Sequence, residues 1–148
     1  MLHAHLSLMH EVLRNTLAAL AGALTGMLLI FAIQGISQRA FYPLPPELNT
    51  RDAAAMAAYF KALPVGAFLF MLLGYFVGVA VGAHVAGRFS FDGGPRQAVM
   101  VTGLFFIASL MNLVAMPHPV WFWFANLATV VFAGWLGIKL LPKRAATP

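Results

Sequence analysis

Apolar residues occur in this chain as long uninterrupted runs, and charged residues mark where the runs stop. Three charge-free runs are long enough to cross a membrane, and they lie between Arg14 and Arg39, between Lys61 and Arg88, and between Arg96 and Lys139. A helix needs about 20 apolar residues to span the hydrocarbon core of a bilayer. The third run is long enough for two such helices, so the pattern predicts four spans.

The third run divides at Pro117-His118-Pro119. Proline disrupts the interior of a helix but fits its first turn, so one helix ends before this tripeptide and the next begins there. The sequence therefore predicts an all-α fold: an integral membrane four-helix bundle that forms a single domain over residues 1–148. We expect its spans near residues 14–37, 64–88, 96–116 and 119–140.

The segment between the first two spans has a pattern of its own. After a proline-rich stretch, residues 49–62 form an amphipathic connector, with Asn49 or Thr50 as the expected N-cap residue. Apolar side chains recur along one face of it at helical spacing, at Met56, Phe60 and Leu63. We expect a short interfacial helix on the outer surface. The alternatives are a packed connector and a lid.

Composition supports the membrane assignment and narrows the chemistry. The chain is 61% hydrophobic and 9% charged, whereas soluble domains average about 45–50% apolar and about 25% charged residues. The net charge of +5 comes from basic residues scattered at the ends of the runs, so we expect contacts with the lipid bilayer and none with nucleic acid. The lack of cysteine excludes disulfides and thiolate metal sites. The chain has no HExxH, G-x-S-x-G or P-loop motif, so we expect no metal and no cofactor, and we favour a protein that is not an enzyme.

The basic residues also predict an orientation. Six of the nine lie on one side of the predicted bundle: Arg14, Arg88, Arg96, Lys139, Lys143 and Arg144. The other three lie on the opposite side: Arg39, Arg51 and Lys61. Because Lys and Arg are enriched in cytoplasmic segments, we expect both termini in the cytoplasm and a bacterial-type plasma (inner) membrane as the location.

Small residues recur along the spans at intervals of four. Those expected to pack helices together are Gly22, Gly26, Gly74, Gly78, Gly82, Ala133 and Gly137. Two helices can approach closely where neither carries a large side chain. The pattern predicts close packing, and it leaves open whether the partner helix belongs to the same chain or to another subunit.

A few polar residues interrupt the last two spans. Ser109 and Asn112 share a face of the third span, and Asn126 and Thr129 lie near each other on the fourth. Measured from His118, Asn112 and Asn126 lie at similar depths, so we expect an interhelical hydrogen bond between them. The same count pairs Ser109 with Thr129. The alternative to this interhelical bonding is a polar path for a solute.

Three further residues bear on function. Gln34, near the outer end of the first span, can join either polar arrangement, and His84 and His118 are candidates for titrating or ligand-binding groups. No Asp, Glu, Lys or Arg lies in the middle of a predicted span, whereas proton-coupled transporters usually keep one there.

These patterns favour a small multi-pass membrane protein that acts by helix packing, as a homo-oligomer or as a subunit or assembly partner of a larger membrane complex. The alternative is a small-solute transporter or lipid-handling protein with a polar path between spans three and four.

Overall fold

The computed structural model describes residues 2–142, with side chains from residue 7 onward, and over this range the chain is helical and contains no strand. Its elements are α1 (Leu2–Ile36), the π-helix η1 (Ser37–Phe41), α2 (Ala53–Ala62), α3 (Val65–Phe89), α4 (Pro95–Ala115) and α5 (Val120–Lys139). Four helices are long and apolar enough to cross a membrane: α1 together with η1, α3, α4 and α5. The predicted all-α four-helix membrane fold is confirmed.

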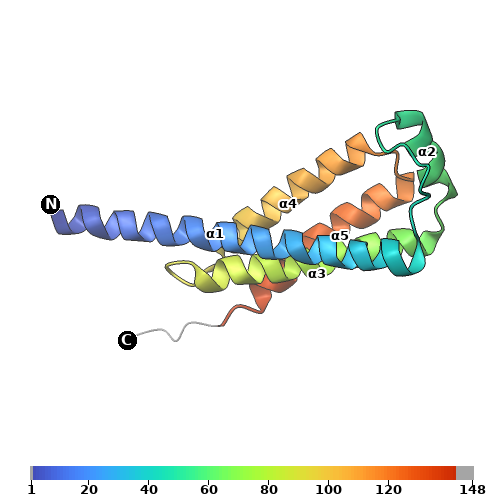
Figure 1. The fold of residues 1–148 in the computed structure, drawn as a ribbon. Coiled ribbons are helices and arrows are strands. Elements are labelled where there is room, and N and C mark those ends of the chain that lie inside the picture. The colour runs from blue at the N-terminus through green and yellow to red at the C-terminus, as the bar shows by residue number, and fades with distance from the viewer. Residues whose placement is uncertain (1, 143–148) are drawn as a thin grey trace.

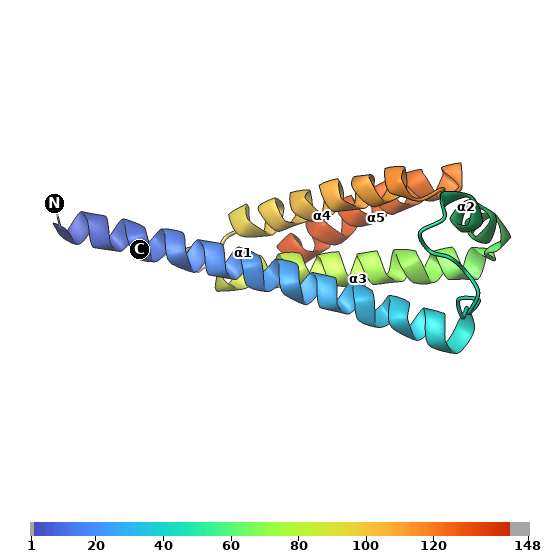
Figure 2. The same cartoon turned by 45° about the horizontal axis from the view of Figure 1, so that its top comes forward.

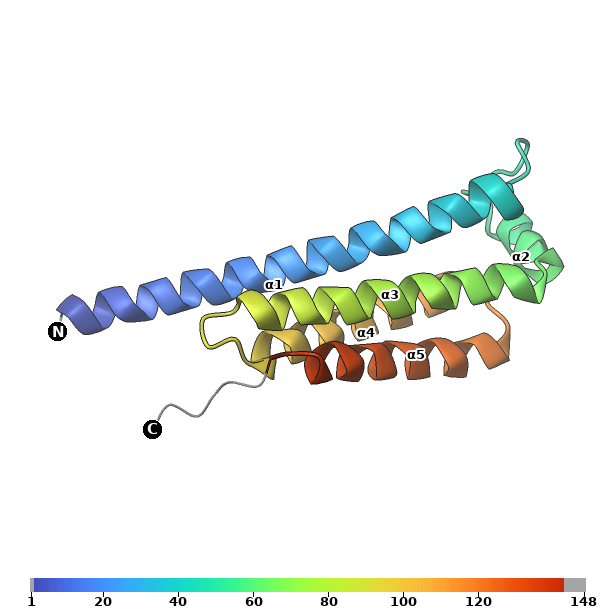
Figure 3. The ribbon, with the colours of Figure 1, turned by 90° about the horizontal axis from the view of Figure 1, so that it is seen from below.

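Helix α3 lies at the centre of the bundle. It packs against α1, α4 and α5, whereas α1 and α5 do not lie against each other within the described residues. Figures 1 and 2 show α2 across one end of the bundle. We call this end, which also holds the turn between α4 and α5, the α2 end. The opposite end, where α3 and α5 end and α4 begins, is the N-terminal end. Figure 3 shows α1 beside α3 near the N-terminal end and diverging from it toward the α2 end.

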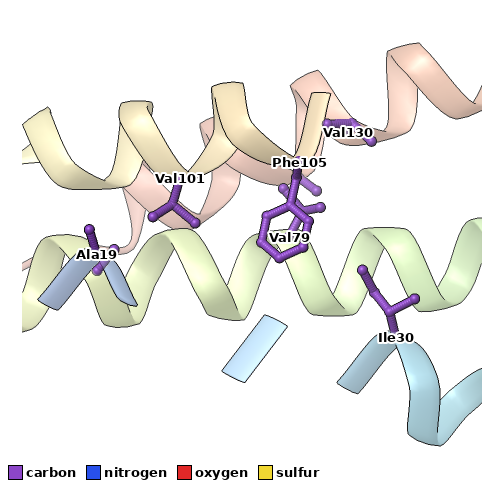
Figure 4. Packing of buried hydrophobic residues seen from close by; sticks show 8 residues of the cluster. Ala19, Ile30, Val79, Val101, Phe105 and Val130 are labelled. Atoms are coloured by element: carbon purple, nitrogen blue, oxygen red, sulfur yellow. The ribbon is translucent and has the colours of Figure 1, made fainter. Parts of the chain in front are cut away.

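The main core forms where all four long helices meet. Each helix contributes small or branched apolar residues, and Figure 4 shows this cluster. Its buried members are Ala19, Ile30, Val79, Ala86, Val101, Phe105, Val130 and Ala133. Val79, Val130 and Ala133 are completely buried. In a membrane the lipid is as apolar as these side chains, so close van der Waals packing and not burial from water stabilises this contact.

A second apolar cluster joins α2 to the bundle. Met56 and Phe60 on α2 are buried against Phe68, Leu113 and Phe122 of the long helices. Leu63 also packs against this cluster. All three members of the expected apolar stripe therefore face the bundle, and α2 covers its end.

The N-cap of α2 differs from the expectation. Asp52, and neither Asn49 nor Thr50, caps the helix: its Oδ1 accepts hydrogen bonds from the backbone N–H groups of Ala54 (2.9 Å) and Ala55 (3.3 Å). Asn49 instead accepts a hydrogen bond from the backbone N–H of Arg51 (3.1 Å), as in an Asx-turn. This turn occupies the residues before Asp52, so the helix begins later than expected.

Proline and glycine set the other helix boundaries. Helix α4 ends at Ala115 and α5 begins at Val120, on either side of the expected proline turn, with Pro119 as N-cap. Pro95 occupies the first turn of α4. In the preceding turn Gly93 has φ of 60°, a left-handed conformation that glycine adopts without steric cost.

Helix α1 is longer than the predicted first span. Its 35 residues extend about 52 Å at 1.5 Å per residue, whereas the hydrocarbon core of a bilayer is about 30 Å thick. The excess projects past the N-terminal end of the bundle (Figure 1). Lys143 and Arg144, counted in the predicted charge asymmetry, lie outside the described residues.

Candidate functional site

A cavity of about 210 Å³ lies at the α2 end, where α1 has diverged from the other helices. Elements α1, η1, α2, α3, α4 and α5 all contribute to its wall. The polar side chains that line it are Gln34, Ser37, Gln38, Tyr42, Tyr59, Tyr75, Asn112 and His118. No Asp, Glu, Lys or Arg lines it. The site therefore offers amides, hydroxyls and one imidazole, and no fixed charge.

Apolar side chains form the rest of the wall. Met56 and Phe60 reach it from α2, and Phe122 reaches it from α5. These three residues also belong to the second apolar cluster, so the packing that holds α2 in place also shapes the cavity. Ligand sites in proteins commonly combine an apolar wall with a few placed polar groups.

The backbone of η1 turns polar residues toward this space. Ser37 is buried, and its carbonyl accepts a hydrogen bond from the backbone N–H of Tyr42 (2.8 Å). A π-helical turn widens the helix locally and is frequent at functional sites. Gly66 on α3 makes room for Tyr42, because a Cβ at residue 66 would collide with the Tyr42 hydroxyl.

A chain of neutral polar groups leads from the cavity into the bundle. Asn112 donates a hydrogen bond through Nδ2 to the Tyr75 hydroxyl (3.3 Å), and Tyr75 also interacts with the Ser109 side chain. Asn126 donates through Nδ2 to the Ser109 hydroxyl. The chain thus runs Asn112, Tyr75, Ser109, Asn126, and we call it the polar chain.

The polar chain ends in an unsatisfied acceptor. Ser109 and Asn126 are fully buried, and Asn126 Oδ1 has no hydrogen-bond partner. Buried polar atoms without a partner are rare in native proteins, and each one needs an explanation such as a water or a ligand. A second such atom, Gln97 Oε1, belongs to the first turn of α4, at the N-terminal end and away from the cavity.

The expected hydrogen-bond pairs between α4 and α5 are wrong by about one helical turn. Asn126 bonds to Ser109 and not to Asn112, and Thr129 donates to the carbonyl of Ala125 in its own helix (2.7 Å). Ser109 and Asn126 lie equally far from the ends of their helices at Ala115 and Val120. Counted from His118, Ser109 and Asn126 lie nine and eight residues away, a closer match than six and eight for Asn112 and Asn126, so the expected pairing was offset by unequal spacing.

His118 sits among aromatic rings beside the cavity. Its ring stacks on Phe122 with centroids 4.9 Å apart, and it meets Phe60 edge-on at 4.8 Å. Its Nδ1 lies 3.0 Å from the carbonyl oxygen of Met116; because a carbonyl only accepts, Nδ1 carries the proton and Nε2 is an acceptor. Burial lowers the pKa of His118 below its usual value, and the bond to Met116 offsets part of that effect.

His84 lies elsewhere. Its Nδ1 is 3.3 Å from the carbonyl oxygen of Gly137, so it joins α3 to α5 in the half of the bundle nearer the N-terminal end. The structure does not bring the two candidate histidines together, and among the described residues no group of three or more His, Cys, Asp or Glu could hold a metal ion.

The small residues on α1 and α3 face each other within one chain. A Cβ at Gly26 would lie 2.6 Å from the Gly78 carbonyl oxygen, and a Cβ at Gly82 would lie 2.7 Å from that of Gly22. Gly74, nearer the α2 end, is looser, with Ile30 O at 3.6 Å. These glycines therefore pack helices of the same chain together.

Helix α5 uses small residues in the same way. A Cβ at Gly137 would collide with the Ala80 backbone of α3, and Ala133 is completely buried in the main core. Gly134, which the sequence pattern did not single out, lies against the Thr102 side chain of α4.

Sequence reasoning identified Gln34, Asn112 and His118 at this site but missed the tyrosines. Tyr75 is the most informative omission, since it connects the cavity to Ser109. A signal was present: a tyrosine in the middle of an apolar span needs a partner for its hydroxyl.

Comparisons with protein-family models, with characterised proteins and with solved structures found no match to this chain. The four apolar helices define a small membrane protein.

Proposed function

We propose that this membrane protein binds a small uncharged polar molecule in the cavity at the α2 end and passes it toward the polar chain, as a small-solute transporter would. One observation carries the proposal: two residues that line the cavity, Tyr75 and Asn112, begin a buried line of neutral hydrogen-bonding groups whose last acceptor, Asn126 Oδ1, has no partner. A molecule that donates a hydrogen bond there would satisfy it.

The lining selects the chemical class of this molecule. Moving a charge out of water is costly unless an opposite charge or several hydrogen bonds compensate, and no charged side chain lines the cavity. The amides and hydroxyls can both donate and accept. Polyols, urea and simple amides fit this pattern, whereas ions do not.

Helix α2 would control access. Its residues Met56, Tyr59 and Phe60 form one wall of the cavity. A movement of α2 away from Phe68 and Phe122 would open that wall, and the return of Phe60 to its cluster would close it.

Solute flux into proteoliposomes tests the proposal. Glycerol and urea should equilibrate faster across vesicles that contain the protein than across empty vesicles. Tyr75→Phe should slow this flux because it breaks the polar chain while keeping the ring. Thr129→Val is the matched control, since the Thr129 hydroxyl bonds only its own helix. No flux for any uncharged solute, or equal flux in Tyr75→Phe and the wild type, would overturn the proposal.

The proposed orientation follows the basic residues. Arg14, Arg88, Arg96 and Lys139 gather at the N-terminal end, against Arg39, Arg51 and Lys61 at the α2 end. We propose a bacterial-type inner membrane, and this asymmetry supports both termini in the cytoplasm and the cavity facing outward. Tagging each end for protease access in oriented vesicles tests it.

Assembly is the second candidate function. A groove of about 540 Å³ runs between α4 and α5. Gly103 opens into it, and nothing lies within 4 Å of the position that a Cβ at this residue would occupy. An open glycine lets another helix approach, so this face, unlike the internal glycines, would suit a homo-oligomer or a larger membrane complex. Gly103→Leu should then change the mass of the native particle, and an unchanged mass would count against assembly through this face.

A further inference from the structure

A second groove, of about 410 Å³, follows α1 at the N-terminal end. It extends along α1 from His10 to Ala21, and Phe89 of α3 closes one side. At 1.5 Å per residue the α1 side is about 16 Å long, close to half the roughly 30 Å thickness of the hydrocarbon core. The groove is thus about as long as one leaflet is deep.

The two halves of this groove differ chemically. His10 and Arg14 form the half nearer the helix N-terminus together with the apolar Leu13, whereas Leu17, Ala18 and Ala21 form the half nearer the middle of the bundle. The small alanine side chains keep the second half open and apolar. A cationic head followed by an apolar channel is complementary to an anionic amphiphile.

The cationic half is held in place by the turn between α3 and α4. Arg14 donates a hydrogen bond through Nε to the carbonyl oxygen of Phe89 (3.2 Å). Its guanidinium carbon lies 6.0 Å from the centre of the Phe91 ring, and the His10 ring meets the same ring edge-on at 6.3 Å. Arginine has five N–H donors, so the bond to Phe89 leaves the others for a ligand.

A second hydrogen bond holds the turn at Phe91 against α1. The backbone N–H of Phe91 donates a hydrogen bond to Asn15 Oδ1 (2.8 Å). Residues adjacent on α1, Arg14 and Asn15, therefore both bond to the end of α3 and the turn after it. A preorganised guanidinium loses less conformational entropy on binding than a free surface arginine does.

We propose that this groove binds one anionic phospholipid from the leaflet at the N-terminal end. Its phosphate lies against Arg14 and His10, and one acyl chain follows Leu17 and Ala21 toward the middle of the membrane. Arg88 and Arg96 at the same end add positive charge, which exceeds the negative charge of Glu11 and Asp92 there. This site is separate from the cavity at the α2 end, and it does not depend on the proposed transport.

Native mass spectrometry of the full chain in mild detergent tests the site. Phosphatidylglycerol and phosphatidylcholine with identical acyl chains are offered at equal concentration. The wild type should retain one phosphatidylglycerol in preference to phosphatidylcholine. Arg14→Gln should lower that preference about fivefold, the effect of one basic residue near an anionic headgroup. Arg39→Gln, which removes a charge at the other end, should leave it unchanged.

Ala21→Phe gives an independent variant that keeps every charge. Ala21 is exposed, so a larger side chain is tolerated by the fold but fills the apolar half of the groove. It should reduce retention of phosphatidylglycerol while the thermal unfolding midpoint stays the same. Equal retention of the two lipids by the wild type, equal effects of Arg14→Gln and Arg39→Gln, or full retention by Ala21→Phe would each overturn the proposal. A second copy of the chain or a copurifying protein bound there in place of lipid would also overturn it.

Discussion

The two ends of this bundle differ in how closely their helices pack. Toward the N-terminal end, α1 and α3 approach so closely that the backbone of each occupies the space where the other's Cβ atoms would be, at Gly22, Gly26, Gly78 and Gly82. At the α2 end the same helices have diverged, and aromatic and amide side chains surround a cavity instead. Dense packing at one end lets the other end keep open space without loss of the fold. Four changes would break or sharpen this contrast.

The largest effect is expected at the tight crossing. A Cβ at Gly78 would lie 2.6 Å from the Gly26 carbonyl oxygen, so Gly78→Leu forces α1 off α3 and should lower the free energy of unfolding by about 3 kcal/mol, at the upper part of the usual range for overpacking. Gly35→Leu is the control, because nothing lies within 4 Å of a Cβ there. Thermal unfolding in detergent measures both, and equal midpoints would contradict the described crossing.

A smaller loss is expected inside the polar chain. Ser109→Ala removes the acceptor of the Asn126 amide, which is fully buried. Leaving a buried donor unsatisfied costs about 1–3 kcal/mol. Thr129→Val should cost much less, since its hydroxyl bonds a carbonyl of its own helix. Unfolding in denaturant measures the free energy of unfolding of both variants. A loss in Thr129→Val as large as that in Ser109→Ala would show that the interhelical bond stabilises the fold no more than a bond within one helix does.

A change at the N-cap of α2 tests the stability of the α2 end alone. Asp52→Ala removes both capping hydrogen bonds and should destabilise α2 by about 1 kcal/mol. Hydrogen exchange of the α2 amides should accelerate, while exchange at the α1–α3 crossing stays unchanged. Asp52→Asn retains a capping oxygen and should preserve protection. Faster exchange throughout the bundle would mean that the two ends unfold together and not independently.

The smallest effect is a pH dependence at His118. Burial lowers the pKa of His118 in the folded protein, so the unfolded chain binds more protons than the folded one below about pH 6.5. The contribution of His118 to stability is therefore complete above that pH, and it is lost as the pH falls toward the lowered pKa. Fluorescence of Trp121, whose ring lies 5.7 Å from that of Phe68, should report loosening of the α2 end between pH 7 and pH 5. His118→Phe should remove this change, and a change of the same size in that variant would assign the effect to another group.

Much of the fold could be predicted because charge and hydropathy report directly on membrane spans. Charged residues and the Pro117–Pro119 turn set the approximate limits of the helices, and Met56 and Phe60 identified the face of α2 that packs. Periodicity shows which face of a helix packs against another helix. It does not show which helix that is, or the angle and register of the contact. For that reason the Ser109–Asn126 pair and the cavity were not predicted. The cavity exists because α1 diverges and η1 widens, and both features depend on tertiary packing.

Helix α1 also has a mechanical consequence. It is one uninterrupted helix from Leu2 to Ile36. At Arg14 it bonds to the last residue of α3, and at Gln34 it forms part of the cavity wall. Between these two points its glycines pack against the backbone of α3, and the Phe105 side chain of α4 also lies against Gly26. We expect a continuous helix held at this crossing to pivot about it. A tilt imposed on its protruding end, by bilayer thickness or curvature, would then change the width of the cavity at its other end.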